Sequence, residues 1–94
     1  MKQSKQYINW AKRIKERDKV CQICKGSGRL QAHHIIPRGY KLTRHEELNG
    51  ILLCYPHHKG PYKSAHQNAV WFNKWLNENK PEVYKYILNL CRNL

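Results

Sequence analysis

The chain is poor in acidic side chains, because Asp and Glu supply only six of its 94 residues against 18 Lys and Arg. The formal net charge is therefore +12 at pH 7. So large a surplus favours a polyanionic partner, and nucleic acid is the first candidate, since each neutralised phosphate releases counterions. A basic surface that only keeps the protein in solution, or a basic ribosome-type protein, is the plainer interpretation.

Long apolar runs are missing as well. The sequence has no run of about 18 or more apolar residues, which excludes a membrane-spanning helix. Residues 1–6 lack the apolar core of a signal peptide, so we expect a cytoplasmic chain. With 40% hydrophobic residues the chain is too apolar for a disordered tail. We expect one domain over residues 1–94, with a core so small that it needs a staple such as a bound metal.

The cysteines indicate what that staple is, because disulfides are rare in the cytoplasm. Cys21-x-x-Cys24 and Cys54-x-x-His57 together offer three thiolates and one imidazole, the ligands of a tetrahedral Cys₃His zinc site. A disulfide pair or free buried thiols are the alternatives. A redox motif at the first pair lacks the βαβ context that such motifs need. The fourth cysteine, Cys91, is predicted to be a small core residue of the last helix.

Helical periodicity predicts three main helices, over residues 4–18, 69–79 and 82–92. Ser4 is the expected N-cap of the first, and a single helical turn is expected to start at Pro56. The apolar stripe of the first helix comprises Tyr7, Trp10, Ala11 and Ile14. Its basic residues lie off this stripe, where they are free to meet phosphate.

Two short strands, residues 30–36 and 51–53, are predicted to pair as an antiparallel hairpin around a polar, basic loop at 37–48. Side chains alternate along a strand, so His33 and His34 should point to opposite sides. Histidine both ligates metals and titrates near physiological pH. One of the two imidazoles can therefore hold a metal while its neighbour works as a base.

Four motifs follow one another in the order Cys21-x-x-Cys24, His33-His34-Ile35-Ile36-Pro37, Asn49-Gly50 and Leu53-Cys54-x-x-His57-His58. In this order they resemble the zinc-containing HNH endonucleases, and most closely the small HNH proteins of phages and prophages. The resemblance implies a small α+β fold, with a ββα-metal core and a structural zinc site over residues 21–66. An N-terminal basic helix (1–20) and two C-terminal helices (67–94) would flank this core.

The resemblance also implies roles for single residues. His33 and His58 correspond to ligands of a catalytic divalent metal, and His34 corresponds to the general base that deprotonates the attacking water. Asn49 corresponds to the residue that braces the hairpin loop and so orients the base. His66 is either a further ligand of that metal or a hydrogen-bonding residue at the entry to the next helix.

The sequence departs from many relatives at His57, where they carry a fourth cysteine. A Cys₃His set remains chemically sound for zinc, but it leaves open whether His57 or His58 faces the zinc. No motif position offers a carboxylate, which argues against two-metal chemistry. Imidazole ligands suit transition ions, so Mn²⁺ or Ni²⁺ is expected to serve as well as Mg²⁺.

The function implied by the resemblance is metal-dependent hydrolysis of double-stranded DNA, by nicking or by cutting both strands, with low sequence specificity. A phage terminase or another DNA-processing protein is the expected partner, inside a phage-infected or prophage-carrying bacterial cell. The candidates for DNA binding are the basic residues Arg38, Lys41, Arg44, Lys12 and Lys15. The alternative is a non-catalytic, zinc-stabilised nucleic-acid-binding module, which needs the charge and the zinc ligands but not the other histidines.

Overall fold

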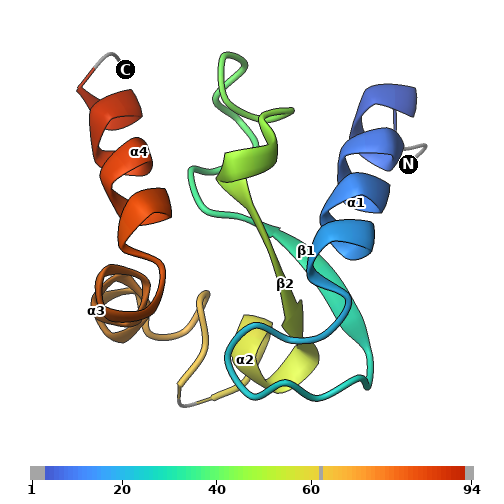
Figure 1. The fold of residues 1–94 in the computed structure, drawn as a ribbon, viewed down its shortest axis with the longest axis vertical. Helices are drawn as coiled ribbons and strands as arrows, with labels where there is room; N and C mark the ends of the chain where they lie inside the picture. Colours follow the sequence, from blue (N-terminus) through green and yellow to red (C-terminus); the bar gives the residue numbers. More distant parts are fainter. Residues whose placement is uncertain (1–3, 62, 93–94) are drawn as a thin grey trace.

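A computed structural model describes residues 4–61 and 63–92, so the N-terminal residues 1–3 considered above lie outside the described part. The elements, in chain order, are α1 (Lys5–Asp18), β1 (Leu30–His34), the 3₁₀ helix η1 (Glu47–Asn49), β2 (Gly50–Cys54), α2 (Tyr55–Lys59), α3 (Ala69–Asn79) and α4 (Pro81–Cys91). The predicted small α+β fold is confirmed (Figure 1). In the described ranges no helix combines the length and the apolarity needed to cross a bilayer.

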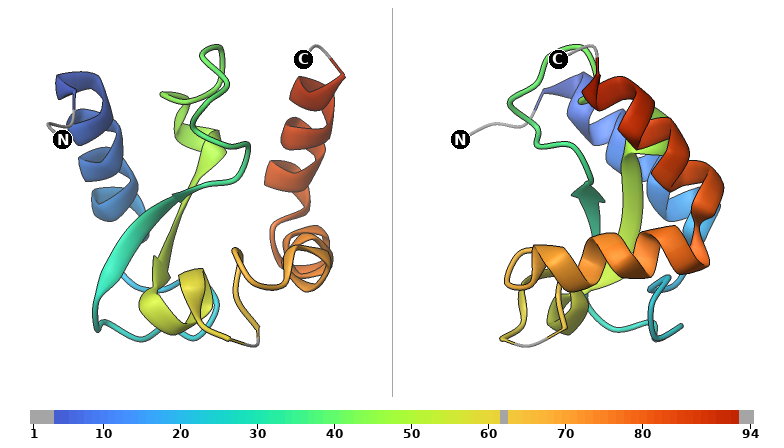
Figure 2. Two further views of the ribbon diagram at one scale, coloured as in Figure 1. Left: turned by 180° about the vertical axis from the view of Figure 1, so that it is seen from behind. Right: turned by 90° about the vertical axis from the view of Figure 1, so that its left-hand side faces the viewer.

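The two strands form an antiparallel hairpin in the middle of the molecule, with Leu30 opposite Cys54 and His34 opposite Gly50. Helix α1 lies on one side of this hairpin and α4 on the other, while α2 and the connecting loop lie at its opposite ends (Figures 1 and 2). One face of the hairpin packs against α1. The other face packs against α2 and α3.

Strand β1 ends at His34, two residues earlier than predicted. The side chain of Asn49 takes over from the strand ladder, because its Oδ1 accepts from the backbone N–H of Ile36 at 2.6 Å and its Nδ2 donates to the Ile36 carbonyl at 3.1 Å. A side chain thus pairs with the backbone where the second strand would have continued. Pro37 then leads the chain into the long loop.

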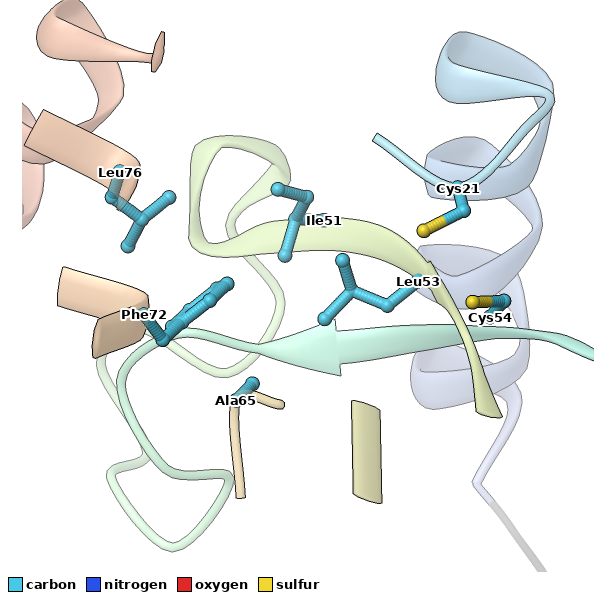
Figure 3. Packing of buried hydrophobic residues seen from close by; sticks show 7 residues of the cluster. All are labelled: Cys21, Ile51, Leu53, Cys54, Ala65, Phe72 and Leu76. Carbon is cyan, nitrogen blue, oxygen red and sulfur yellow. The ribbon is translucent and has the colours of Figure 1, made fainter. Parts of the chain in front are cut away.

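Strand β2 is buried along its whole length, and its side chains alternate between two small cores. Leu52 packs against Trp10 and Ile14 of α1. The opposite face carries a larger cluster made of Cys21, Ile51, Leu53, Cys54, Ala65, Phe72 and Leu76 (Figure 3). The cysteines lie at one end of this cluster and the α3 side chains at the other, so the metal-binding loops are part of the core.

Two features let α1 pack so closely against the hairpin. A Cβ atom at Gly50 would lie only 2.6 Å from Trp10 and 2.6 Å from Ile14, so a larger residue has no room there. At the end of the helix, Arg17 donates to the Gly50 carbonyl at 2.6 Å, and the Asp18 carboxylate accepts from the Leu52 N–H at 3.0 Å. Helix α1 is therefore fixed to the start of β2 by packing and by hydrogen bonds.

The prediction that Cys91 is a core residue is wrong, because this side chain is exposed. Helix α4 buries Ile87, whereas the neighbouring Leu88 is 46% exposed. Cys91 lies one turn beyond Ile87, where it borders an open hollow beside Ile35 and Pro37. Helical spacing predicted the apolar stripe correctly but not the point at which the core ends.

Candidate active site

The short helix α2 carries two adjacent histidines that face two different clusters. Its successive side chains differ in direction by about 100°, so His57 and His58 cannot face the same site. His57 lies with the three cysteines Cys21, Cys24 and Cys54. His58 lies with His33 and His66. The structure therefore assigns His57 to the cysteine cluster, which the sequence left open.

The cysteine cluster has the dimensions of a zinc site. Its potential ligand atoms all lie within 4.8 Å of one another. The Sγ atoms of Cys24 and Cys54 are 3.7 Å apart, and His57 Nδ1 is 3.2 Å from Cys54 Sγ and 3.8 Å from Cys21 Sγ. A tetrahedral ion with bonds of about 2.3 Å to sulfur would separate two sulfurs by about 3.8 Å. The cluster is therefore consistent with a structural zinc.

Electrostatics favour a cation in the same place. Burial and the neighbouring thiols of Cys21 and Cys24 raise the pKa of Cys54 to about 11. Three thiolates cannot be held this close together without a positive charge to compensate them, and a coordinated thiol loses its proton outright. The backbone N–H of Gly26 donates to Cys24 Sγ at 3.4 Å, in the tight turn that directly follows the second cysteine.

The second cluster consists of three imidazoles from three different elements. His33 comes from β1, His58 from α2 and His66 from the turn before α3, and their potential ligand atoms also lie within 4.8 Å of one another. His58 Nε2 and His66 Nε2 are 3.0 Å apart. His33 and His58 are buried, while His66 lies at the exposed side.

Burial also decides the protonation of these histidines. Burial, and next the neighbouring His58 and His66, lower the pKa of His33 from 6.5 to about 3. Burial and His66 lower the pKa of His58 to about 4, and the pKa of His66 is lowered mainly by burial. All three imidazoles are therefore neutral at pH 7, which is the state that binds a divalent ion. The donor set fits such an ion, with imidazole nitrogens and no carboxylate.

His34 lies on the other face of β1, as strand alternation predicts. Its ring stacks on Trp10 of α1, with centroids 3.8 Å apart and planes 10° from parallel. Its Nε2 is 2.8 Å from the Arg44 carbonyl, which can only accept, so Nε2 carries the proton and Nδ1 keeps a lone pair. Burial and then the charge of Arg38 lower the pKa of His34, against the effect of the Arg44 carbonyl.

Asn49 connects the hairpin to the carbonyl that holds His34. The Asn49 side chain is fully buried, and besides its two bonds to Ile36 it donates from Nδ2 to the Thr43 carbonyl at 3.1 Å. Thr43 directly precedes Arg44. The loop that presents the Arg44 carbonyl to His34 is therefore tied to the base of the hairpin through one amide side chain.

The histidines line a cleft that we call the histidine cleft, with a volume of about 520 Å³. Its lining includes His33, His34, His58, His66, Arg38 and Lys59. The guanidinium of Arg38 lies 4.0 Å from the ring centroid of Tyr7, which also lines the cleft. The cleft thus brings together the two histidine faces of β1 and two positive side chains.

A second hollow of about 690 Å³, the lysine groove, runs between α1 and β1. It carries Lys12 and Lys15 and shares Tyr7, Ala32, His58 and Lys59 with the histidine cleft. Lys41 and Arg44, the other two basic candidates from the sequence, are not among the residues that line either hollow. Three of the five predicted basic residues therefore border the candidate site.

Residues 21–60 match a family model described as HNH endonuclease. This segment of the chain is therefore similar to the HNH endonucleases. This HNH segment contains both halves of the cysteine cluster together with His33, His34, Asn49 and His58, whereas His66 lies outside it. A match to an endonuclease family indicates nuclease activity. No curated protein and no solved structure matches the chain.

Three residues of the site did not appear among the sequence candidates. Lys59 borders both hollows, and its place directly after His58 was a signal for it. Trp10 was predicted as a core residue only, yet it also covers the ring of His34. Gln31 contacts His58, and its position two residues before His33, on the same face of the strand, was the only sequence signal.

Proposed function

We propose that the chain is a metal-dependent HNH endonuclease that hydrolyses double-stranded DNA, nicking it or cutting both strands, with low sequence specificity. The observation that carries this proposal is the pair of histidine sites in one cleft, with His33, His58 and His66 on one face of the hairpin and His34 on the other. All described elements border the hairpin or one another, which supports residues 1–94 acting as one nuclease unit.

In this proposal His33, His58 and His66 hold the catalytic ion, which can be Mg²⁺, Mn²⁺ or Ni²⁺. A bound divalent ion supplies Lewis-acid stabilisation of the charge that develops on the scissile phosphate and on the departing 3′ oxygen. The three histidines are ready to bind it at neutral pH, because their lowered pKa values keep their nitrogen lone pairs free of protons. Cys21, Cys24, Cys54 and His57 hold a separate structural zinc.

His34 acts as the general base. Its Nε2 proton is committed to the Arg44 carbonyl, so Nδ1 accepts the proton of the attacking water. The stack on Trp10 and the Asn49-braced loop restrict the rotation of the imidazole, which keeps the base in place before the substrate arrives. A pKa below 6.5 means that His34 is unprotonated and competent at pH 7.

The lysine groove and the cleft offer a path for the DNA backbone. We propose that Lys12 and Lys15 contact phosphates beside the cleavage site, with Arg38 and Lys59 nearer to it. Lys41 and Arg44 are proposed as outer contacts from the loop. The double variant Lys12→Glu, Lys15→Glu should weaken binding and reduce the slope of log K against log salt. Lys74→Glu, Lys85→Glu carries the same charge change on α3 and α4 and should leave a larger slope.

The alternative, a non-catalytic zinc-stabilised nucleic-acid-binding module, shares the charge and the cysteine cluster. It gives no reason for three neutral histidines to converge beside a fourth that is stacked and hydrogen-bonded. A phage or prophage setting, with a terminase or another DNA-processing protein as partner, stays a prediction from the resemblance.

Plasmid cleavage tests the proposal. Zinc-loaded protein should relax supercoiled plasmid when Mg²⁺ or Mn²⁺ is added and leave it intact when no ion is added. His58→Ala should lose this activity while keeping one zinc per chain, and His45→Ala, in the loop outside both clusters, should retain it. DNA binding without cleavage under every ion would overturn the proposal and favour the alternative.

A further inference from the structure

Gln31 joins the first strand to the buried histidine of α2. Residues 31 and 33 are two apart in β1, so their side chains share the strand face that looks toward α2. The Oε1 atom of Gln31 lies 2.7 Å from Nδ1 of His58. Gln31 therefore contacts the Nδ1 side of the His58 ring. The ring of His33 lies beside that of His58, and the two ring centroids are 4.9 Å apart.

This contact decides which nitrogen of His58 carries the proton. An amide oxygen has lone pairs and no hydrogen, so it can only accept, and His58 must donate from Nδ1. A neutral imidazole has a single N–H, so Nε2 of His58 keeps its lone pair. Nε2 is also the atom that lies 3.0 Å from His66 Nε2, on the side where the three histidines converge.

Burial makes this hydrogen bond consequential. His58 is only 7% exposed, so water has little access to replace a lost partner at Nδ1. Without an acceptor there, the other tautomer, with the proton on Nε2, would become competitive. That tautomer places a proton where a metal must bind, so each binding event would first have to move it.

We propose that Gln31 is a positioning residue for the catalytic metal: it fixes the tautomer and the ring orientation of His58, so that Nε2 is presented to the ion. This inference rests on the proposed ligation of the ion by His58, but it makes a separate claim about metal affinity. Removing a residue that orients a ligating histidine typically lowers metal affinity or activity by about 10- to 100-fold.

Metal affinity of the zinc-loaded protein, measured with Mn²⁺ by calorimetry or electron paramagnetic resonance, tests the proposal. Gln31→Leu should weaken Mn²⁺ binding about 10- to 100-fold. Gln31→Glu keeps an acceptor of the same reach and should bind Mn²⁺ at least as tightly as the unmodified chain. Gln22→Leu is the matched control, because Gln22 is a part-buried glutamine whose hydrogen bonds go to Asp18, Val20 and Lys80, away from the histidines.

Nitrogen-15 spectra of the histidines, recorded on protein with one zinc per chain before Mn²⁺ is added, provide a readout that a general loss of stability would not move. His58 should carry its proton on Nδ1 in the unmodified chain and in Gln22→Leu, and should shift toward the Nε2–H form in Gln31→Leu. A His58 protonated on Nε2 in the unmodified chain would overturn the proposal, as would equal losses of Mn²⁺ affinity in Gln31→Leu and Gln22→Leu.

The outcomes separate this inference from the proposed function. If the unmodified chain binds Mn²⁺ and cleaves plasmid but Gln31→Leu binds as tightly, only the role of Gln31 is wrong. If Gln31→Leu loses affinity as expected but no variant or ion supports cleavage, the proposed function is wrong and the role of Gln31 stands. If the unmodified chain binds none of Mg²⁺, Mn²⁺ and Ni²⁺, both are wrong.

Discussion

At the scale of single residues, the neighbours of each histidine assign its role. His57 lies among thiols, His33 and His58 lie among other imidazoles, and His34 lies between an indole ring and a backbone carbonyl. Burial keeps the last three neutral, so each offers a nitrogen lone pair at pH 7. The same side chain can therefore serve a structural ion, a catalytic ion and proton transfer within one small hairpin.

The lowered pKa of His33 makes stability depend on pH. The unfolded chain takes up a proton at this residue near pH 6.5, whereas the folded chain does so only near pH 3. The unfolded state therefore binds more protons between these values, and stability is lost as the pH falls below about 6.5. His33 alone should account for up to about 2 kcal/mol of the free energy of unfolding by pH 5.

Urea denaturation at pH 7.5 and pH 5 checks this expectation. Because acid also releases zinc from the cysteine cluster, the comparison is with His33→Gln, which keeps that cluster and lacks the titrating group. The unmodified chain should lose more stability than His33→Gln between the two pH values. Equal losses would mean that His33 is not held neutral in the folded state.

At the scale of elements, helix α1 is part of the site and not only a cover for the hairpin. Trp10 packs on Leu52 in the core and stacks on His34 at the edge of the cleft. The close approach depends on Gly50, which stands opposite His34 in the strand pairing. A substitution that moves α1 away from the hairpin should therefore also displace the imidazole of His34, because Trp10 stacks on it.

Gly50→Ala tests this coupling. Its new Cβ would meet Trp10 and Ile14 at 2.6 Å, and such overpacking costs about 1–3 kcal/mol. We expect a lower urea midpoint and slower plasmid cleavage with Mn²⁺ binding nearly unchanged. Gly28→Ala is the control, since a Cβ there meets nothing within 4 Å. If Gly50→Ala is destabilised but cleaves plasmid at the original rate, the position of α1 does not affect the general base His34.

Much of the element pattern could be predicted from the sequence, because it depends on local spacing. The stripe of α1, the two half-sites of the cysteine cluster and the opposite directions of His33 and His34 all follow from periodicity. The early end of β1 could not be predicted, because the side chain of Asn49, the last residue of η1, replaces the ladder. Contacts between distant segments, such as that of Gln31 with His58, could not be predicted, because local spacing gives the strand face of Gln31 but not its partner.

At the scale of the whole molecule, the cysteine cluster joins segments that the small core alone holds weakly. Cys21 and Cys54 belong to the main hydrophobic cluster. An ion bound there therefore also connects the loop that carries Cys21 and Cys24 to β2 and α2. A chain of this length buries a limited apolar area, and bound metal is a common source of the missing stability. Cys91 takes no part in this, because it is exposed at the end of α4.

Two serine variants test this division of the cysteines. Cys54→Ser should lose zinc and at least about 3 kcal/mol of stability, which lowers Tm by about 12–24 °C for a domain of this size. Cys91→Ser should keep one zinc per chain and the original Tm. Metal analysis and thermal unfolding by circular dichroism measure both. A Cys54→Ser variant that retains zinc and Tm would show that the cluster is not the staple of the fold.

The most direct test of the whole account is the rate at which His34→Ala nicks supercoiled plasmid in Mn²⁺, measured at matched zinc content and matched DNA binding. Loss of a general base costs about 10²- to 10⁴-fold in rate. The account predicts a loss of this size, with zinc content, Mn²⁺ affinity and DNA affinity unchanged. Cleavage by His34→Ala at the rate of the unmodified chain would contradict it.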